Sequence, residues 1–158
     1  MYEEQEWSDI YGETPFNATR MKHIENGIYN NSKSINGVVL YENEDGTNED
    51  IILNDNAENY NFIEIYGYRL LSTEKVKGSV KVDNPNGSIA TLSIDRPAYS
   101  ELVVNTTGII SFLINGTSMS KIGCITYNIG SGNDISITSA SATTLYITKV
   151  IGYKEKRI

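Results

Sequence analysis

The hydrophobic pattern changes once along this chain, from a helical spacing near the front to a strand-like alternation beyond it. Within residues 14–35 the apolar positions recur three, three, four and seven residues apart, at Ala18, Met21, Ile24, Ile28 and Ile35. This narrow stripe is typical of a coiled-coil seam rather than of the wide apolar face of a helix buried in a globular core. Asn31 takes the next seam position after Ile28, where a polar residue can set register and oligomer number.

A stripe of this kind has to be covered, and two surfaces can cover it. Other copies of the same helix are the interpretation that we favour, and the alternative is that the helix lies across the β region of its own chain. Asn17 is a favourable N-cap, and Asn36-Gly37 is a stop signal, so both ends of the helix are marked. A helix of this length spans about 30 Å and is marginal alone in water.

From Val38 onward the pattern predicts a mainly β region of about ten short strands at regular spacing. We expect them at 38–41, 51–53, 62–68, 79–82, 89–94, 101–104, 109–114, 121–127, 134–137 and 145–153. Such spacing without a second helical segment is typical of an antiparallel β-sandwich or jelly-roll-like head. The turn Asn84-Pro85-Asn86-Gly87 is expected to close a tight hairpin. Residues 1–36 then form an arm and helix, and residues 37–158 form the head.

Composition excludes several classes of protein. The formal net charge is −7 and the calculated pI is about 4.7. No basic cluster accompanies that acidity, so we expect no nucleic-acid binding. No apolar run reaches the length of a membrane span, and the acidic start is unlike a signal peptide. We therefore expect a soluble protein made in a cytosol, without membrane insertion.

Residues 1–13 form an acidic arm that is too short for a core of its own. Its large apolar side chains, with one that follows the arm, are candidates for attachment to a larger assembly: Trp7, Ile10, Tyr11 and Phe16. An exposed Trp in a short arm can anchor a docking contact. The same residue can equally pack on the helix that follows.

Catalytic and metal-binding constellations are scarce. The single histidine, His23, lies on the expected helix, and Cys124 sits in a strand-like run, which leaves no soft-ligand zinc set and no nucleophile–base pair. The acidic segment 42–50 fails the EF-hand frame, because Tyr41 and Ile52 fall at its two end positions. We interpret it as a solvated hairpin, and the alternative is an irregular Ca²⁺ loop. We expect no metal and no cofactor, while a carboxylate pair of a glycan-processing enzyme stays open.

The positive clue is aromatic, since the chain has eleven tyrosines against three phenylalanines and one tryptophan. Tyrosine offers an apolar ring face and a hydroxyl, which suits contacts with sugar rings. We place candidate carbohydrate contacts in two regions. Tyr66, Tyr68 and Arg69 lie at a predicted strand end that enters a loop, and Asp95, Arg96 and Tyr99 lie in a second predicted loop.

The front of the chain carries a motif made of Trp7, Asp9, Thr14-Pro15-Phe16-Asn17-Ala18 and the run 21–28, MKHIENGI. This motif resembles a recurring N-terminal signature of tail and baseplate proteins of phages that infect Gram-positive bacteria. Phe16 replaces the usual aliphatic residue of that pattern. Three stretches of the second half are similar to a head domain of such proteins, namely 59–66 (NYNFIEIY), 79–87 (SVKVDNPNG) and 145–153 (LYITKVIGY).

The resemblance implies a homotrimeric tail-tip or baseplate component, made in the bacterial host cytoplasm and carried on the virion tail. The helices would form a trimeric bundle, the arm would contact other tail proteins, and the β head would point outward to bind host cell-wall saccharide without catalysis. Two alternatives stay open, a purely structural baseplate component and a glycan-processing enzyme with a carboxylate pair.

Overall fold

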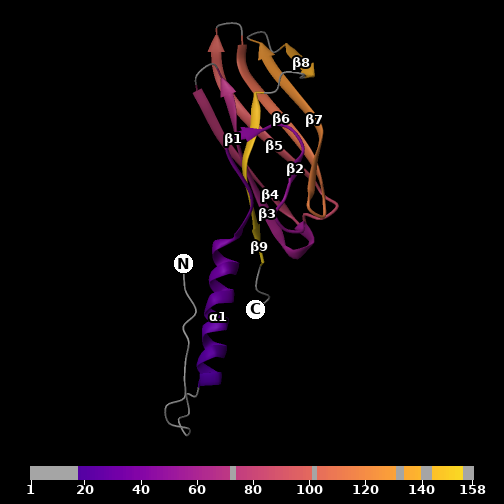
Figure 1. Cartoon of the computed structure of the whole chain (residues 1–158). Coiled ribbons are helices and arrows are strands. Elements are labelled where there is room, and N and C mark those ends of the chain that lie inside the picture. Colours follow the sequence, from indigo (N-terminus) through magenta and orange to yellow (C-terminus); the bar gives the residue numbers. More distant parts are fainter. Residues whose placement is uncertain (1–17, 72–73, 101–102, 131–133, 140–143, 155–158) are drawn as a thin grey trace.

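The computed structural model describes residues 18–71, 74–100, 103–130, 134–139 and 144–154. One helix leads into a two-layered body of antiparallel strands, and the helix points away from that body (Figure 1). The elements in chain order are α1 (Ala18–Asn36), β1 (Val38–Thr47), β2 (Ile51–Ile52), a 3₁₀ turn (Ala57–Asn59), β3 (Phe62–Leu71), β4 (Glu74–Asp83), β5 (Ile89–Ser100), β6 (Val103–Asn115), β7 (Ser118–Gly130), β8 (Ile135–Ser139) and β9 (Leu145–Tyr153).

The strands form two sheets, which confirms the predicted antiparallel β-sandwich. The first sheet has the order β1-β9-β3-β4, and the second has the order β2-β7-β6-β5 with β8 paired to β7. The last strand, β9, is central because it pairs with β1 on one side and with β3 on the other. Residues from the front, middle and end of the chain therefore meet on one sheet.

The core lies between the two sheets. It takes alternate residues from each strand, as the two-residue period of an extended chain requires. The first sheet contributes Leu40, Ile63, Ile65, Ile147 and Val150, and the second contributes Ile51, Leu92, Ile110, Phe112, Ile114 and Met119. Each of these side chains is at most 2 % exposed. The residues between them in sequence face outward and take no part in the core.

Two tight turns of the head differ in what they connect. Gly116, with φ +60°, closes the β6–β7 hairpin in which Asn115 pairs with Ser118. The turn at residues 84–87 is tight, but it carries the chain from β4 in the first sheet to β5 in the second. The hairpin predicted there is wrong, because burying both strands requires the chain to cross the sandwich.

The acidic segment 42–50 is likewise not a hairpin. Its first part belongs to β1, which pairs with β9, while the following β2 joins the second sheet beside β7. Several strands are also longer than predicted. Residues 103–104 of one expected strand and all of the expected strand 109–114 fall in one strand, β6, and β5 continues through Pro97. Proline is tolerated there because β5 is an edge strand of its sheet.

The helix begins at Ala18 and ends at Asn36, close to the predicted bounds. Gly37 follows with φ +67°, and a Cβ on it would lie 2.4 Å from Ile151 Cγ2, so the stop requires glycine. No described helix has the length and apolar character needed to cross a membrane.

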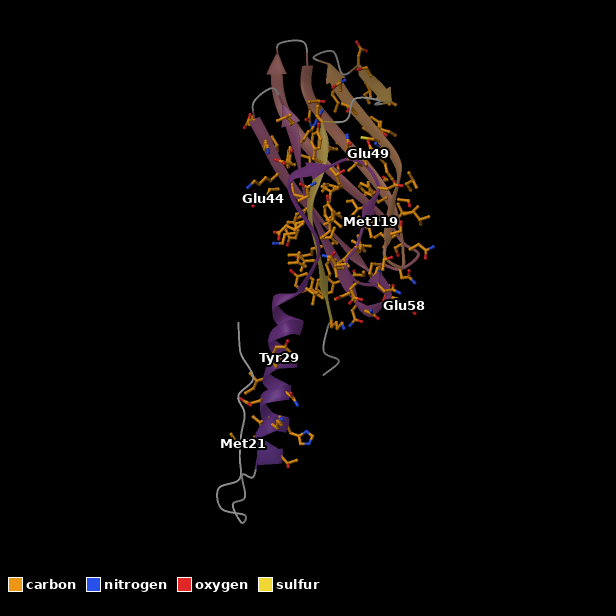
Figure 2. All side chains as sticks on the ribbon, viewed as in Figure 1. Met21, Tyr29, Glu44, Glu49, Glu58 and Met119 are labelled. Atoms are coloured by element: carbon orange, nitrogen blue, oxygen red, sulfur yellow. The ribbon has the colours of Figure 1, made fainter. Side chains whose placement is uncertain are left out.

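The helix stripe is not covered by the head of the same chain. Ile24 and Ile28 are each 47 % exposed, and Met21 is half-buried. In Figure 2, Met21 and Tyr29 lie on the projecting helix, far from Met119 in the core of the sandwich. The side chains of Ala18, Asn31 and Ile35 lie outside the described set. The described residues contain one α-helix, and the trimeric bundle stays a prediction.

The close approach of the chain at Gly152 gives a test of the core. A Cβ at this position would lie 2.5 Å from Tyr60 Cδ1, whereas a Cβ at Gly123 has no atom within 4 Å. We expect Gly152→Ala to lower the free energy of unfolding by about 1–3 kcal/mol through overpacking. Gly123→Ala, the matched control, is expected to raise it by at most about 1 kcal/mol. Urea unfolding measures both, and equal stability of the two variants would contradict this packing.

Candidate functional site

The outer face of the first sheet, turned away from the core, carries aromatic and charged side chains in alternation with the buried ones. Along β3, Ile65 faces the core while Tyr66 and Tyr68 face outward. Along β4 the lysines at 75 and 77 face outward on the same side. The two Tyr residues were predicted at a strand end entering a loop, and that placement is wrong, because β3 continues to Leu71.

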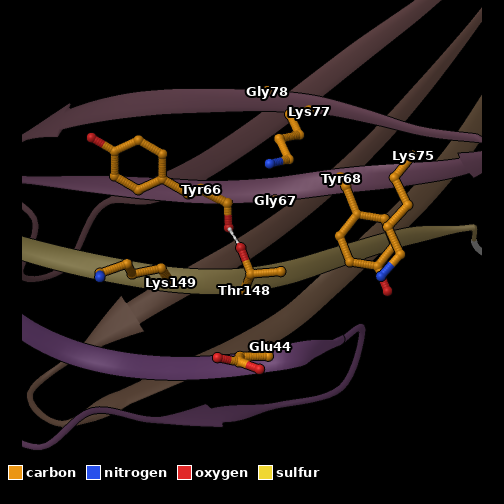
Figure 3. A pocket seen from close by; sticks show the side chains of 9 residues that line it. All are labelled: Glu44, Tyr66, Gly67, Tyr68, Lys75, Lys77, Gly78, Thr148 and Lys149. Atoms are coloured by element: carbon orange, nitrogen blue, oxygen red, sulfur yellow. Dashed lines mark hydrogen bonds between the residues drawn. The ribbon is translucent and has the colours of Figure 1, made fainter.

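A pocket opens on this face with a volume of about 450 Å³, which lies within the range of small-molecule sites. Figure 3 shows that its lining comes from four strands, β1, β3, β4 and β9. The lining residues are Glu44, Tyr66, Gly67, Tyr68, Lys75, Lys77, Gly78, Thr148 and Lys149. The set combines two phenol rings, three ammonium groups, one carboxylate and one threonine hydroxyl.

Two paired glycines form the floor of the pocket. Gly67 in β3 pairs with Gly78 in β4. A Cβ on Gly67 would lie 2.8 Å from Leu92 Cδ2, and a Cβ on Gly78 would lie 2.8 Å from Ile94 Cγ1. The second sheet thus packs directly on the inner side of both glycines, so neither position has room for a side chain.

Tyr68 forms a fixed wall of the pocket. Its hydroxyl donates to the Asp45 carbonyl oxygen at 2.7 Å. Its ring stacks on Tyr146 with centroids 5.2 Å apart, and Lys75 Nζ lies 4.3 Å from the ring centroid. These contacts leave Tyr68 7 % exposed. Tyr68 therefore supports the pocket, and little of its ring surface remains for stacking on a sugar.

Tyr66 is the more accessible of the two predicted tyrosines, being half-buried. Its hydroxyl donates to Glu64 Oε2 at 2.5 Å, and the Tyr153 hydroxyl donates to the same oxygen at 3.1 Å. The hydrogen bond to Glu64, followed by burial, raises the pKa of Tyr66 above its ordinary range. For Tyr153, burial raises the pKa first and Glu64 second. The shared carboxylate fixes both rings, because it accepts from each.

The charges around the pocket are arranged in two walls. Lys149 Nζ lies 2.7 Å from Glu42 Oε1 of β1, so these two charges neutralise one another. Glu44, also from β1, lies on the same side of the pocket (Figure 3). On the β4 side, Lys75 and Lys77 have no carboxylate partner within ion-pair distance among the described residues. One wall is therefore cationic and the other acidic.

Arg69 does not belong to this site. It is 4 % exposed and faces the core, on the opposite side of β3 from Tyr66 and Tyr68. One guanidinium nitrogen donates to the Thr106 carbonyl oxygen at 2.7 Å, and another contacts Thr106 Oγ1 at 3.0 Å. Arg69 thus bridges the two sheets, and the prediction that it lies on the surface beside the tyrosines is wrong.

The second predicted loop, around residues 95–99, is part of β5 in the second sheet. Asp95 is exposed and accepts a hydrogen bond from Thr107 Oγ1 at 2.7 Å within that sheet. Arg96 and Tyr99 lie on the same strand, with side chains outside the described set. The structure therefore does not bring Asp95 into the pocket of the first sheet.

The other predicted residues give no second site. Trp7, Ile10, Tyr11 and Phe16 lie outside the described residues. His23 is exposed on α1, and Cys124 packs partly buried against the core. Within the described ranges, no group of three or more His, Cys, Asp or Glu side chains could hold a metal ion.

Sequence reasoning missed the lysines of the pocket, although a signal was present. In the run KVKGSVK, residues 75–81, lysine or serine alternates with valine or glycine, which predicts a strand with a polar outer face. Tyr146 and Lys149 in β9 were less predictable. Their orientation depends on a β-bulge opposite Tyr66 and Gly67, which the residue pattern does not reveal.

Comparison of the chain with protein-family models, with curated proteins and with solved structures gives no significant match.

The shared carboxylate gives a prediction for alkaline pH. Tyr66 and Tyr153 hold their protons above the ordinary pKa of 10.0, so their contribution to stability is complete below pH 10.0 and is lost as the pH rises further. We expect Glu64→Gln to make both tyrosines ionise at a lower pH, as followed by tyrosinate absorbance. Above pH 10.0, the free energy of unfolding of the variant should fall by less than that of the parent chain. Tyr60 is the internal control. Burial and Asp55, rather than Glu64, raise its pKa, so its ionisation should be the same in the variant and in the parent chain. An unchanged titration in the variant would contradict this assignment.

Proposed function

We propose that this chain is a tail-tip or baseplate protein of a phage or prophage of Gram-positive bacteria. Its β head binds host cell-surface carbohydrate, multivalently and without catalysis. The resemblance of the N-terminal signature and of three head stretches supports the viral assignment. The fold and the pocket support the binding role.

The observation that carries the binding role is the pocket on the outer face of the first sheet. It combines the half-buried ring of Tyr66 with hydrogen-bonding groups of both kinds, such as Lys77 as a donor and Glu44 as an acceptor. Sugars present apolar ring faces edged by hydroxyls, which require these two kinds of contact together. The hydrogen bonds of Tyr66 and Tyr68 hold the walls in place before a ligand arrives, which lowers the cost of binding.

The uncovered helix supports the multivalent part of the proposal. Ile24 and Ile28 are exposed on a helix that projects from the head (Figure 1). Burying this stripe between three copies would place three heads at one end of a bundle. Weak binding at each pocket then adds up, because linked sites engage one surface at a high effective concentration.

One observation favours the alternative of a purely structural baseplate component. Each strand of the second sheet carries a large apolar side chain that is exposed, at Ile52, Ile89, Leu113, Ile122, Ile135 and Ile137. Their exposed fractions run from 39 % at Leu113 to 79 % at Ile52. Two of them, Ile89 and Leu113, are cross-strand partners, and exposed apolar side chains that gather on one sheet favour contacts between proteins. A head that only packs on neighbours would use this sheet and leave the pocket empty.

Binding of wall polysaccharide tests the proposal against this alternative. We expect the full chain to bind purified polysaccharide from at least one member of a panel of Gram-positive bacteria. Tyr66→Ala should weaken that binding by about tenfold or more, since losing a ring contact of about 1.4 kcal/mol per site has this effect. Tyr127→Ala is the matched control, because Tyr127 is a half-buried tyrosine of the second sheet.

Two results would count against the binding role. Absence of binding across the panel would favour the structural alternative, and equal loss in Tyr66→Ala and Tyr127→Ala would remove the pocket from the argument. Release of sugar fragments from the polysaccharide would instead indicate an enzyme.

The helix assignment has its own test. We expect sedimentation equilibrium at micromolar concentration to give the mass of three chains. The double variant Ile24→Ser, Ile28→Ser should give one chain, because two apolar residues of the seam are lost. Val39→Ser is the control, since Val39 is 40 % exposed on the head rather than on the helix. A monomeric parent chain would contradict the bundle, and would leave the pocket unaffected.

A further inference from the structure

We propose that the saccharide bound in this pocket carries an anionic group, a phosphate or a carboxylate, and that Lys75 and Lys77 hold that group at the β4 wall. The proposal rests on the carbohydrate-binding function and narrows it to one class of sugar. It also assigns a direction to the ligand, with the anion at β4 and the hydroxyl-bearing part at β1.

The local charge of the pocket runs against the charge of the chain. The whole protein has a formal net charge of −7, which repels an approaching anion. The lining nevertheless contains three lysines and one glutamate. A cationic lining on an acidic protein favours an anionic ligand at short range, where nearby charges outweigh distant ones screened by salt.

The two lysines of the β4 wall are the ones that remain available. Lys149, the third lysine of the lining, is already ion-paired with Glu42 at 2.7 Å. Lys75 Nζ lies over the Tyr68 ring at 4.3 Å from the centroid, an arrangement that positions the ammonium group without neutralising it. In Figure 3, Lys77 extends into the space between Tyr66 and Tyr68. The lining thus offers two ammonium groups to an anion, one over the Tyr68 ring and one between the two tyrosines.

A lysine on β4 can also have a simpler purpose, because β4 is the edge of its sheet and edge lysines discourage pairing with other chains. Lys81 shows what such a residue looks like on this strand. Its ammonium group lies 3.2 Å from Asp83 Oδ1 and 4.0 Å from the Phe62 ring centroid. Lys81 is thus occupied by its own neighbours and lies outside the pocket lining, unlike Lys75 and Lys77.

The opposite wall supplies the direction. Glu44 approaches from β1, on the far side of β9 from the β4 lysines (Figure 3). A carboxylate accepts hydrogen bonds from sugar hydroxyls and repels a phosphate or a carboxylate. A charged saccharide is therefore favoured in one orientation and disfavoured in the reverse one.

The test uses monovalent soluble probes, so that avidity does not obscure the single site. The probes are one neutral gluco-oligosaccharide, the same oligosaccharide with a terminal phosphate, its counterpart ending in a uronic acid, and inorganic phosphate. Isothermal titration of the full chain with each probe gives the dissociation constants. Far-UV circular dichroism checks that every variant retains its fold.

We expect at least one of the two anionic saccharides to bind about tenfold or more tightly than the neutral one, with an affinity that falls as salt is raised. Lys77→Ala should remove most of that preference, because it weakens the anionic saccharide by a larger factor than the neutral one. Lys81→Ala, the matched control on the same strand, should change neither. Glu44→Gln should weaken the neutral and the charged saccharides by similar factors.

Each opposing result has a distinct meaning. Equal binding of neutral and anionic saccharides, unchanged in Lys77→Ala, would overturn the anionic group and leave the carbohydrate-binding function standing. Inorganic phosphate that binds as tightly as the phosphorylated saccharide would overturn the saccharide assignment of this pocket. Binding of wall polysaccharide that is lost in Tyr127→Ala and retained in Tyr66→Ala would place the sugar elsewhere, and would overturn both.

Discussion

The burial of one side of β3 and β9 against the second sheet is the constraint on which the rest of the structure depends. Ile63 and Ile65 on β3 and Ile147 and Val150 on β9 are at most 1 % exposed. Because an extended chain alternates its side chains, burying this set forces the residues between them outward. The outer face with its tyrosines and lysines is thus a consequence of core formation. A register shift of one residue would exchange the pocket for a buried polar layer.

A single irregularity in this pairing shapes the site. Opposite Tyr66 and Gly67 the register of β9 shifts by one residue, so that Tyr66 pairs with Lys149 and Gly67 pairs with Ile147. Thr148 is the extra residue, and its hydroxyl contacts the Tyr66 carbonyl oxygen at 3.3 Å. The bulge keeps Ile147 and Val150 on the core side although they are three residues apart. It brings the Lys149 ammonium group to the acidic wall of β1, and so creates the contrast between the two walls.

The tyrosines of this face divide into supports and contacts. Tyr68, Tyr146 and Tyr153 are held by neighbouring groups of the chain. The Tyr68 hydroxyl donates to the Asp45 carbonyl oxygen and the Tyr153 hydroxyl donates to Glu64. The Tyr68 ring stacks on Tyr146, and the Tyr153 ring stacks on Phe62. Tyr66 is fixed through its hydroxyl and keeps part of its ring accessible. A face built this way is rigid and offers only a small contact area for one ligand. Such a site suits a protein in which several heads act together, as a helix with an uncovered apolar stripe would allow.

The sequence by itself determined the local elements of this protein. The helix between Ala18 and Asn36, the stop at Gly37, the β6–β7 turn at Gly116 and the all-β character of the rest follow from spacing and turn chemistry. Only the tertiary structure decided that the turn after β4 crosses between sheets, and that Arg69 faces the core while Tyr66 faces outward. The physical reason is the distance in sequence over which each signal acts. Periodicity shows which residues alternate along one strand. It does not record which strand becomes the neighbour, and bulges, ion pairs and ring stacks arise between residues as distant in sequence as Glu42 and Lys149.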